Sequence, residues 1–414
     1  MSGFEYVPRI VDAELFAALK RAGAVLIEGP RACGKTETAL QIANSVVRID
    51  REPGFVDLLG IDPQLGLQGE VPRLFDEWQL APQLWNIVRG EVDARRQKGQ
   101  FILTGSTAPA LDAKRHTGAG RFARLKMRTM TLSETGHSTN ETSFVDLLAG
   151  DSPRTTDPGF SYRDLVTRIV VGGWPGFQDL DAAQASLNLR DYLDTVAEVD
   201  LQEVDSVQRD PVRIRRLLSA LARSTASEVT LATLAKDETS LSRDTVRDYL
   251  AALQRIFIIE DQPAWSAHLR SSATLRQEPK RHFVDPSLAV AALGASEDAL
   301  LKDPRFTGRL FESLVVQQLR VFSQAVSGTV SHARDSQGRE LDAVVTLPDG
   351  TWSAFEIKLG HDPAVVDAGA ARLLKFAGQV AHNQPTSLTV VVSSGPSYRR
   401  PDGVNVVAIG TLGP

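Results

Sequence analysis

The stretch GPRACGKT, which begins at Gly29, constrains the fold of this chain more than any other. It matches the pattern G-x-x-x-x-G-K-[ST] in full and follows the apolar run AVLIE, which is typical of a buried strand over residues 24–27. In such a loop the backbone amides turn inward around phosphates, the lysine reaches the β- and γ-phosphates and the hydroxyl ligates Mg²⁺. Helical spacing of Ala39, Leu40, Ile42 and Ala43 predicts a following helix, whose N-terminus favours an anion.

A nucleotide site of this kind also needs carboxylates near the metal, and the segment PRLFDEWQLAP supplies two. We expect Asp76 to hold Mg²⁺ with Thr36, directly or through water, and Glu77 to orient or deprotonate the attacking water. The alternative is a solvated acidic pair at a helix start. Pro72 and Arg73 interrupt the strand pattern that precedes this pair.

The next strand and the segment after it add polar candidates. FILTGS ends in Thr104 and Ser106, where a sensor of the γ-phosphate would lie. Arg121 or Arg124 would act as an arginine finger toward the chain's own nucleotide or a neighbouring subunit's, and the alternative for each is a surface arginine. The predicted nucleotide-binding residues are Gly29, Pro30, Arg31, Ala32, Cys33, Gly34, Lys35, Thr36, Glu37, Asp76 and Ser106.

Composition bounds the rest of the chain. With 414 residues it is too long for one ordinary core, so two to four domains are expected. The net charge of −5 means that a polyanion site must be a local patch. Cys33 is the single cysteine, which excludes an intrachain disulfide and fits a cytoplasmic protein. No signal peptide and no membrane-spanning run are expected.

An ordered set of motifs spans nearly the whole chain: GPRACGKT, LFDEWQLAP, FILTGS, GAGR, VVGGWPGF, HFVDPSLA, GRLFESLVVQQL and FEIK. On this set the chain resembles a bacterial family of AAA-type ATPases with a C-terminal domain of uncharacterised function and nuclease-like fold. The resemblance implies a three-layer α/β ATPase domain with Lys35, Thr36, Asp76 and Glu77 at its nucleotide positions. The chain departs from the family at two points: Trp78 stands where an aliphatic residue is usual, and the strand before Asp76 is interrupted. Both departures concern the hydrolysis of the nucleotide more than its binding.

The middle of the chain begins with a polar stretch rich in Ser, Thr and Pro over residues 137–162, which indicates a connector with one short helix, FVDLL. Gly172 and Gly173 before Trp174 predict a tight turn that packs an indole. Residues 186–204 then predict a long amphipathic helix with a core stripe of Leu187, Tyr192, Leu193 and Val196. The resemblance implies a lid over the nucleotide here, and plain bundle packing is the alternative.

Residues 211–285 predict three helices and a two-stranded hairpin, which together describe a winged helix. The third helix, with Ser242 as its N-cap, would be the recognition helix of a DNA binder. Two of its arginines and a basic loop form a concentrated basic strip on an acidic chain, although Asp244 and Asp248 lie close by. Packing without DNA is the alternative. The predicted DNA contacts are Arg243, Arg247, Arg270, Arg276, Lys280 and Arg281.

The C-terminal region predicts a metal site. GRLFESLVVQQLRVF is a helix with Glu312 in its early turns, and residues 339–360 predict a β-hairpin turned by PDG. Strand alternation lets Asp342 meet Glu356 and Lys358 across the hairpin. Three carboxylates and a lysine form the metal cradle of restriction-endonuclease-like nucleases, with Asp342 and Glu356 on Mg²⁺, Glu312 in support and Lys358 activating water. The alternative is a nuclease-like fold in which these residues form ion pairs.

These interpretations predict an α/β protein with four parts: a P-loop ATPase domain over 1–136, a connector and helical lid over 137–205, a winged helix over 206–288 and a restriction-endonuclease-like α/β domain over 289–414. The leading hypothesis is a Mg²⁺-dependent ATPase that acts on DNA as a homo-oligomer, with no membrane partner. Two alternatives are an ATP-gated metal-dependent nuclease, serving as a toxin or defence effector, and a nucleotide-switched adaptor without nuclease activity. The predicted catalytic residues are Lys35, Glu77, Arg121, Arg124 and Lys358.

Overall fold

The computed structural model of the chain describes residues 5–107, 118–203, 207, 209–236, 241–266, 278–334, 338–380 and 383–414. It divides into two compact units. The first contains Met1–Thr129, Leu201–Val207 and Ala252–Ile258, and the second contains Met130–Asp200, Gln208–Ala251 and Ile259–Pro414. The finer division into four parts stays a prediction.

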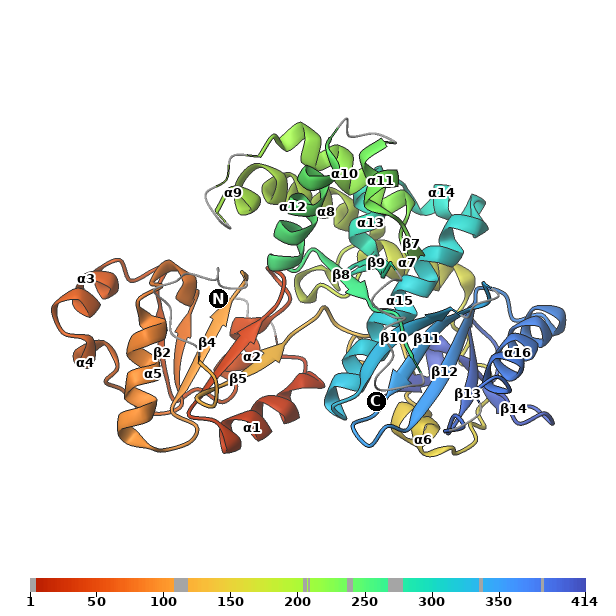
Figure 1. Cartoon of the computed structure of the whole chain (residues 1–414), viewed down its shortest axis with the longest axis horizontal. Helices are drawn as coiled ribbons and strands as arrows, with labels where there is room; N and C mark the ends of the chain where they lie inside the picture. Colours follow the sequence, from red (N-terminus) through yellow and green to blue (C-terminus); the bar gives the residue numbers. More distant parts are fainter. Residues whose placement is uncertain are drawn as a thin grey trace. The chain divides into compact units, whose positions relative to one another are not determined.

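The first unit is built on a five-stranded parallel sheet with the order β2-β3-β4-β1-β5 (Figure 1). Its strands are β1 (Ala24–Glu28), β2 (Ser45–Arg48), β3 (Arg73–Asp76), β4 (Phe101–Gly105) and β5 (Phe122–Lys126). The strands expected over AVLI and FILTG are therefore confirmed. The strand before Asp76, expected to be interrupted, is instead regular and pairs on both edges, because the proline lies just outside it.

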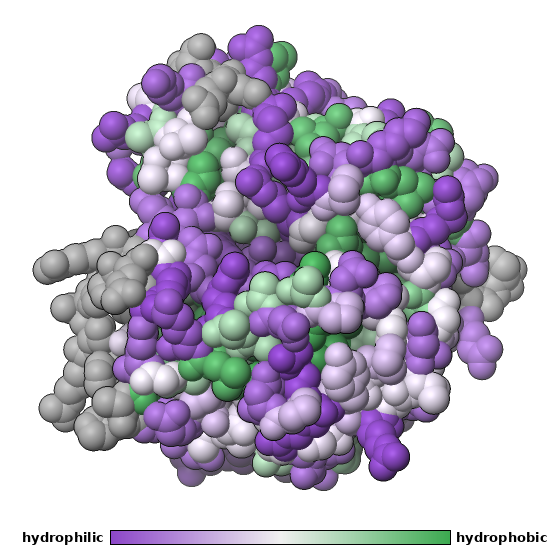
Figure 2. All heavy atoms as spheres, turned by 90° about the vertical axis from the view of Figure 1, so that its right-hand side faces the viewer, coloured by the Kyte–Doolittle hydropathy of each residue, from purple (hydrophilic) through white to green (hydrophobic). Residues whose placement is uncertain are grey.

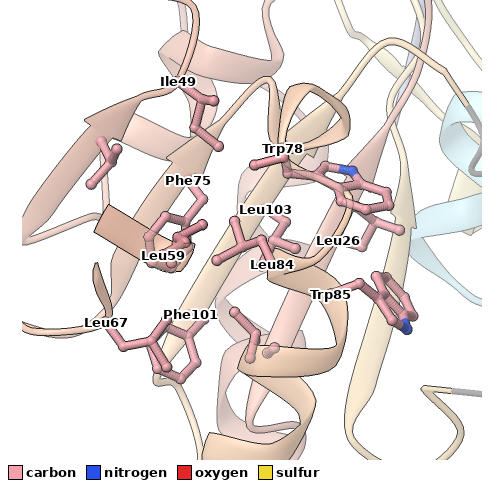
Figure 3. Packing of buried hydrophobic residues seen from close by; sticks show 14 of the residues in the cluster. Leu26, Ile49, Leu59, Leu67, Phe75, Trp78, Leu84, Trp85, Phe101 and Leu103 are labelled. Carbon is pink, nitrogen blue, oxygen red and sulfur yellow. The ribbon is translucent and has the colours of Figure 1, made fainter. Parts of the chain in front are cut away.

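Helices cover both faces of this sheet, which gives three layers. On one face, α3 (Gly54–Ile61) and α5 (Leu84–Arg95) pack over Leu26, Phe75 and Leu103, as Figure 3 shows at close range. On the other face, α1 (Val11–Arg21) and α2 (Lys35–Leu40) pack over Val25 and Ile27. The short helices α4 (Pro63–Gly66) and η1 (Trp78–Leu80) also belong to this unit. The helix predicted through Ala43 ends at Leu40, because Ser45 already starts β2.

The second unit begins with β6 (Thr142–Ser143) and α6 (Phe144–Ala149), the short helix that the sequence predicts. The segment is more than a connector, because β6 pairs with β16 (Leu412–Gly413) at the far end of the chain. The helix α7 (Tyr162–Val171) and the turn η2 (Pro175–Phe177) follow. Trp174 lies between them, is buried and donates a hydrogen bond from Nε1 to Ser287 Oγ at 3.0 Å. The predicted turn that packs an indole is confirmed.

The long amphipathic helix of the prediction forms α8 (Ala182–Thr195), a π-helical turn η3 (Val196–Asp200) and α9 (Leu201–Glu203). Its core stripe differs from the expected one. Leu187 is 59 % exposed, whereas Leu189, Leu193 and Val196 are buried. Assigning Leu187 to the core was wrong because the inward face follows the i, i+4 row through Leu189 and Leu193.

Three helices and a small sheet follow in the predicted order. They are α10 (Pro211–Arg223), β7 (Ser227–Glu228), α11 (Leu231–Leu234), α12 (Arg243–Arg255), β8 (Ile259–Gln262) and β9 (Lys280–Phe283), and the strands pair antiparallel as β7-β9-β8. Ser242 caps α12, since its Oγ accepts from the amide of Thr245 at 3.1 Å. The three helices and the β8–β9 pair agree with the prediction, whereas β7 adds a third strand that was not predicted. The name winged helix stays a prediction.

The C-terminal part of the second unit is a mixed six-stranded sheet with the order β10-β11-β12-β13-β15-β14. Its strands are β10 (Thr329–Arg334), β11 (Glu340–Thr346), β12 (Trp352–Lys358), β13 (Leu388–Val392), β14 (Tyr398–Arg399) and β15 (Asn405–Ala408). The β11–β12 pair is the predicted antiparallel hairpin, and β12, β13 and β15 run parallel.

Helices pack on this sheet and precede it. α13 (Pro286–Leu293) and α14 (Glu297–Lys302) lead into α15 (Pro304–Ala325), which packs against β10, β11 and β12. α16 (Pro363–Ala377) covers Val344, Ala354 and Val390 through Ala370 and Leu373. The turn η6 (Ile409–Thr411) precedes β16. The restriction-endonuclease-like assignment of this α/β region stays a prediction.

On the face shown in Figure 2, hydrophilic residues predominate and hydrophobic ones are interspersed among them. Among the helices of the described ranges, none has both the length and the apolar composition that a membrane span requires.

Candidate functional site

The loop between β1 and α2 is shaped by residues with left-handed backbone. Ala32 has φ 62° and Gly34 has φ 103°. Gly29 is required for a different reason: a Cβ placed there would lie 2.2 Å from the carbonyl oxygen of Met127. Cys33 is fully buried against the same neighbour, which is the small packing role that suits it. These constraints hold the loop close to β5 and curl its backbone.

Lys35 opens α2 and folds back over the loop. Its side chain is only 6 % exposed, and Nζ donates to the carbonyl oxygens of Gly29 at 3.0 Å and Pro30 at 2.7 Å. The ammonium is therefore held at the concave side of the loop by two carbonyls and by no carboxylate that the described residues provide. A cation in that position can bind an anion without first breaking an ion pair.

Three polar side chains converge beside the lysine from α2, β3 and β4. Asp76, at the carboxyl end of β3, accepts hydrogen bonds at Oδ1 from Thr36 Oγ1 at 2.7 Å and from Thr104 Oγ1 at 2.5 Å. Carboxyl ends of parallel strands meet at one edge of the sheet, which explains how residues distant in sequence come together. Hydroxyl and carboxylate oxygens are the ligands that Mg²⁺ prefers.

Glu77 follows Asp76 with a left-handed backbone, φ 55°, and its carboxylate accepts a hydrogen bond from Gln79 Nε2. Gly105 leaves room for this pair, because a Cβ there would lie 2.8 Å from Gln79 Oε1. Sequence analysis missed Gln79, although its place two residues after the acidic pair is a usable signal. The glutamine fixes the orientation of the carboxylate that the prediction treats as a base.

Ser106 completes the polar edge just beyond β4. It is buried, and within the described part of the chain its Oγ has no hydrogen-bond partner. An orphaned buried hydroxyl favours a polar ligand or water at this point. Together with the loop, the lysine and the paired hydroxyl and carboxylate, it fits a nucleoside triphosphate with Mg²⁺. Arg31 and Glu37 are exposed at the rim.

The structure separates one of the two predicted arginine fingers, Arg121, from this edge. Arg121 precedes β5, whose first residue pairs with Ala24, so it lies at the amino end of the strands, opposite the loop. The length of β1 is about 16 Å at ~3.3 Å per residue. Arg121 pairs with Asp93 at 2.8 Å, and Arg124 is exposed with Nη1 3.9 Å from Glu28. The expectation that Arg121 contacts the nucleotide of its own chain is therefore wrong. The strand direction places Arg121 at the amino end of the sheet, and the loop lies at the carboxyl end.

Arg9 is a second residue that sequence analysis missed. Its buried guanidinium donates to the carbonyl oxygens of Cys33 at 2.9 Å and Arg128 at 3.0 Å. Arg9 thereby links the loop between β1 and α2 to the segment that follows β5. No local motif signals this role, since the bonded residues are 24 and 119 positions away.

In the second unit, the predicted C-terminal residues do converge. Lys358 Nζ lies 2.6 Å from Glu356 Oε1 and 3.8 Å from Asp342 Oδ2. Glu312, from α15, lies 2.6 Å from Lys280 Nζ, which is also 3.5 Å from Asp342 Oδ1. Sequence analysis missed Arg372 of α16, whose Nη1 lies 2.6 Å from Glu356 Oε1. We call these six residues the ionic cluster: Lys280, Glu312, Asp342, Glu356, Lys358 and Arg372.

Burial governs the protonation of the ionic cluster. It raises the pKa of Glu312 to about 8 and that of Glu356 to about 7, and the charge of Asp342 adds to both shifts. Burial alone would lower the pKa of Lys280, but Glu312 and Asp342 outweigh it and raise the pKa above its ordinary value. The lysine is therefore a buried cation held by its carboxylate neighbours.

The predicted DNA contacts divide into three groups. Arg243 and Arg247 are exposed on the first turns of α12, although Arg247 pairs with Asp244 at 2.7 Å. Arg270 and Arg276 lie outside the described residues. Lys280 and Arg281 belong to β9 and not to a loop.

Lys280 and Arg281 are both buried, and Arg281 pairs with Asp261 at 3.0 Å. Assigning Lys280 and Arg281 to an exposed basic wing was wrong, because a buried cation paired with a carboxylate is not open to a phosphate.

Three family models match successive parts of the chain. Residues 21–136 match a family described as AAA domain. Residues 162–299 match Domain of unknown function (DUF8612), and residues 307–412 match Domain of unknown function (DUF4143). The first match supports an AAA-type P-loop ATPase domain with ATP binding, and it coincides with the sheet and loop of the first unit.

Similar proteins are found among curated sequences and solved structures. An uncharacterised protein of Mycobacterium tuberculosis and one of Mycobacterium bovis are each 28% identical over 398 residues, which is 92% of this chain and 82% of the relative. A Walker-type ATPase of Pyrococcus abyssi is 14% identical with a TM-score of 0.40, covering 68% of this chain and 94% of its own. A Vibrio cholerae protein is 9% identical with a TM-score of 0.18, and the match covers 93% of this chain and 94% of that protein.

Proposed function

We propose that this protein is a Mg²⁺-dependent ATPase that acts on DNA as an oligomer. The observation that carries the ATPase part is the convergence of Lys35, Thr36 and Asp76 at the carboxyl edge of the parallel sheet. The match of residues 21–136 to an AAA domain supports it.

The chain's own residues divide the work as follows. Bound ATP supplies the bond that is cleaved, and Mg²⁺ supplies charge neutralisation at its phosphates. Lys35 exchanges its two loop carbonyls for phosphate oxygens. Thr36 and Asp76 hold the metal, and Ser106 donates its free hydroxyl to the terminal phosphate.

Glu77 orients the attacking water and takes its proton. Gln79 keeps that carboxylate in one orientation through the hydrogen bond from its side-chain amide. Because the bond is already made without substrate, the base needs little reorganisation when water arrives.

Two observations support the finer parts of the proposal. Arg243 and Arg247 present exposed guanidinium groups on one side of α12, which suits contact with DNA phosphates. Arg121 lies at the sheet edge opposite its own loop, which favours an arginine finger directed at a neighbouring subunit. An oligomer would bring that arginine to a second nucleotide.

A nucleotide-switched adaptor without nuclease activity is the second candidate. It is supported by the ionic cluster, in which every predicted metal-binding carboxylate lies near a lysine or arginine. In that case ATP binding would change a partner contact, with slow turnover and no cutting.

The deciding experiment measures ATP turnover with and without single-stranded, duplex and branched DNA, beside a cleavage assay on the same samples. We expect DNA to raise the rate, Lys35→Ala to abolish turnover, and the exposed-lysine control Lys98→Ala to leave it unchanged. Arg243→Ala/Arg247→Ala should remove the stimulation and keep basal turnover, and Arg163→Ala, an exposed arginine of α7, is its control. Unchanged turnover in Lys35→Ala would refute the nucleotide assignment. DNA-independent turnover without cutting selects the adaptor.

A further inference from the structure

Lys280 has a setting unlike that of the other cations near the C-terminal sheet. Its side chain is 3 % exposed, and Nζ lies 2.6 Å from Glu312 Oε1 and 3.5 Å from Asp342 Oδ1. These are two of the carboxylates that the sequence assigns to a divalent metal. The ammonium therefore lies between Asp342, a predicted Mg²⁺ ligand, and Glu312, which the prediction places in support of that ligand.

The backbone holds Lys280 in this position. It belongs to β9, the central strand of the three-stranded sheet, and pairs with Glu228 of β7 on one side and Gln262 of β8 on the other. Gln262 in turn donates from Nε2 to the carbonyl oxygen of Asp342 at 3.0 Å. The strand that delivers the lysine is thus bonded to the strand that carries the aspartate.

One oxygen of the remaining carboxylate, Glu356 Oε1, also has cationic partners, whereas Oε2 has no hydrogen-bond partner among the described residues. Glu356 Oε1 accepts from Lys358 Nζ and Arg372 Nη1, both at 2.6 Å. Asp342 Oδ2 accepts from the amide of Ile357 at 2.8 Å. Three carboxyl groups thus face three cationic side chains, and each carboxyl group already has a lysine or an arginine as its neighbour.

A divalent metal fits this arrangement poorly. Mg²⁺ and Mn²⁺ need several oxygen ligands with free lone pairs at about 2.0–2.2 Å. Here the facing oxygens of Glu312 and Asp342 hold an ammonium, and Glu356 Oε1 holds two donors. Within the described residues, no group of three or more His, Cys, Asp or Glu side chains is arranged to hold a metal ion. The metal that a restriction-endonuclease-like fold implies does not fit the residues present.

We propose that the Lys280 ammonium takes the place of a divalent cation in the C-terminal region of this chain. Glu312 and Asp342 bind this lysine, and no metal enters while it is there. The region then works as a metal-independent fold, and Lys280 is the residue that decides this. This inference concerns the second unit and does not depend on the nucleotide site.

The test is calorimetric titration of nucleotide-free protein with Mn²⁺, in an Asp76→Asn background that removes the nucleotide-site metal ligand. With Lys280 intact we expect no Mn²⁺ binding that depends on Asp342. Lys280→Met should gain a site at least about tenfold tighter than any background binding, and Asp342→Asn should remove it. Lys358→Met is the matched control, because it removes a lysine of the same cluster and leaves Lys280 in place, so it should gain no site.

Two results of the titration overturn the proposal. One is Mn²⁺ binding by the protein with Lys280 intact that is lost in Asp342→Asn. The other is a folded Lys280→Met protein, checked by circular dichroism, that binds no Mn²⁺. If Lys280→Met does not fold, Lys280→Gln replaces it, and the thermal midpoint of the Lys280-containing protein in Mn²⁺ against EDTA gives a second readout. An Asp342-dependent rise of that midpoint in Mn²⁺ refutes the proposal, and an unchanged midpoint supports it.

Discussion

At the scale of single residues, Glu77 and Gln79 make the most specific claim about chemistry. Glu77 contacts Gln79 and not the Lys35 ammonium, so removing its charge should leave the phosphate cradle intact. We expect Glu77→Gln to keep ATP affinity within about threefold and to lower kcat by at least about a hundredfold. Gln79→Ala should lower kcat by a smaller factor. Steady-state rates beside nucleotide titrations measure both, and a parallel loss of binding in Glu77→Gln would contradict the assigned role.

Gly29 allows a steric prediction with a matched control. Gly29→Ala should distort the loop and weaken ATP binding, because the new Cβ would lie 2.2 Å from the carbonyl oxygen of Met127. Gly90→Ala meets nothing within 4 Å on α5 and should raise stability by about 0.5–1 kcal/mol through helix propensity. Nucleotide titration and chemical unfolding compare the two. Normal ATP affinity in Gly29→Ala would contradict the loop geometry.

Residues of the nucleotide site could be predicted where the signal is local. Lys35 and Thr36 belong to a contiguous motif, and Asp76 belongs to the acidic pair in LFDEWQLAP, so the local sequence indicates all three. Arg9 acts through carbonyls 24 and 119 positions away, which no sequence window contains. Lys280 was assigned to a loop because a basic residue in sequence is read as exposed, and only the packed fold supplies its buried partners.

At the scale of elements, a shift in a strand boundary changes what its residues do. Lys280 was expected in the basic loop of the hairpin, but it is the first residue of β9. Lys280 and His282 then face one side of the small sheet and Arg281 the other, toward Asp261. The strands at AVLI and FILTG and the helix cap at Ser242 were readable from apolar runs and from the cap residue. The exact start of β9 was not, because tertiary ion pairs stabilise it and local propensity does not.

The buried histidine of β10 gives a prediction about pH. Burial lowers the pKa of His332 to about 4. The unfolded chain binds that proton near pH 6.5, so the stability present above pH 6.5 is lost as pH falls toward 4. The loss attributable to this group is at most about 3 kcal/mol.

Urea unfolding of the second unit at pH 7.5 and pH 5 tests this. His332→Gln should reduce the loss of stability between the two values, and His361→Gln, at an exposed position, should not. If His332→Gln loses as much stability between pH 7.5 and pH 5 as the wild type does, the pH dependence belongs to other groups. His282 is one of them, because burial also lowers its pKa.

At the scale of the whole molecule, the order of the sheets and helices along the chain was easier to predict than the pairing of strands distant in sequence. A parallel sheet, a helical region and a C-terminal α/β sheet follow from periodicity and motifs. The pairing of β6 with β16 joins residues about 270 positions apart, and it was not predicted because both strands are only two residues long. The position of Arg121 opposite the loop follows only from the parallel strand direction.

That position predicts complementation between subunits. Arg121→Ala lacks the finger, and Glu77→Gln lacks the base, so each protein alone should turn over ATP slowly. Mixed oligomers contain some interfaces where an intact Glu77 meets an intact Arg121, so mixing the two variants should restore part of the activity. Activity equal to the average of the separate proteins, in samples shown to exchange subunits, would contradict a finger supplied by a neighbour.

The most direct test of the central claim is calorimetric titration of the intact chain with ATP and Mg²⁺. The account predicts saturable binding of one ATP per chain, loss of that binding in Lys35→Ala and no change in Lys98→Ala. Absence of binding in the intact chain, or equal binding in Lys35→Ala, would contradict it.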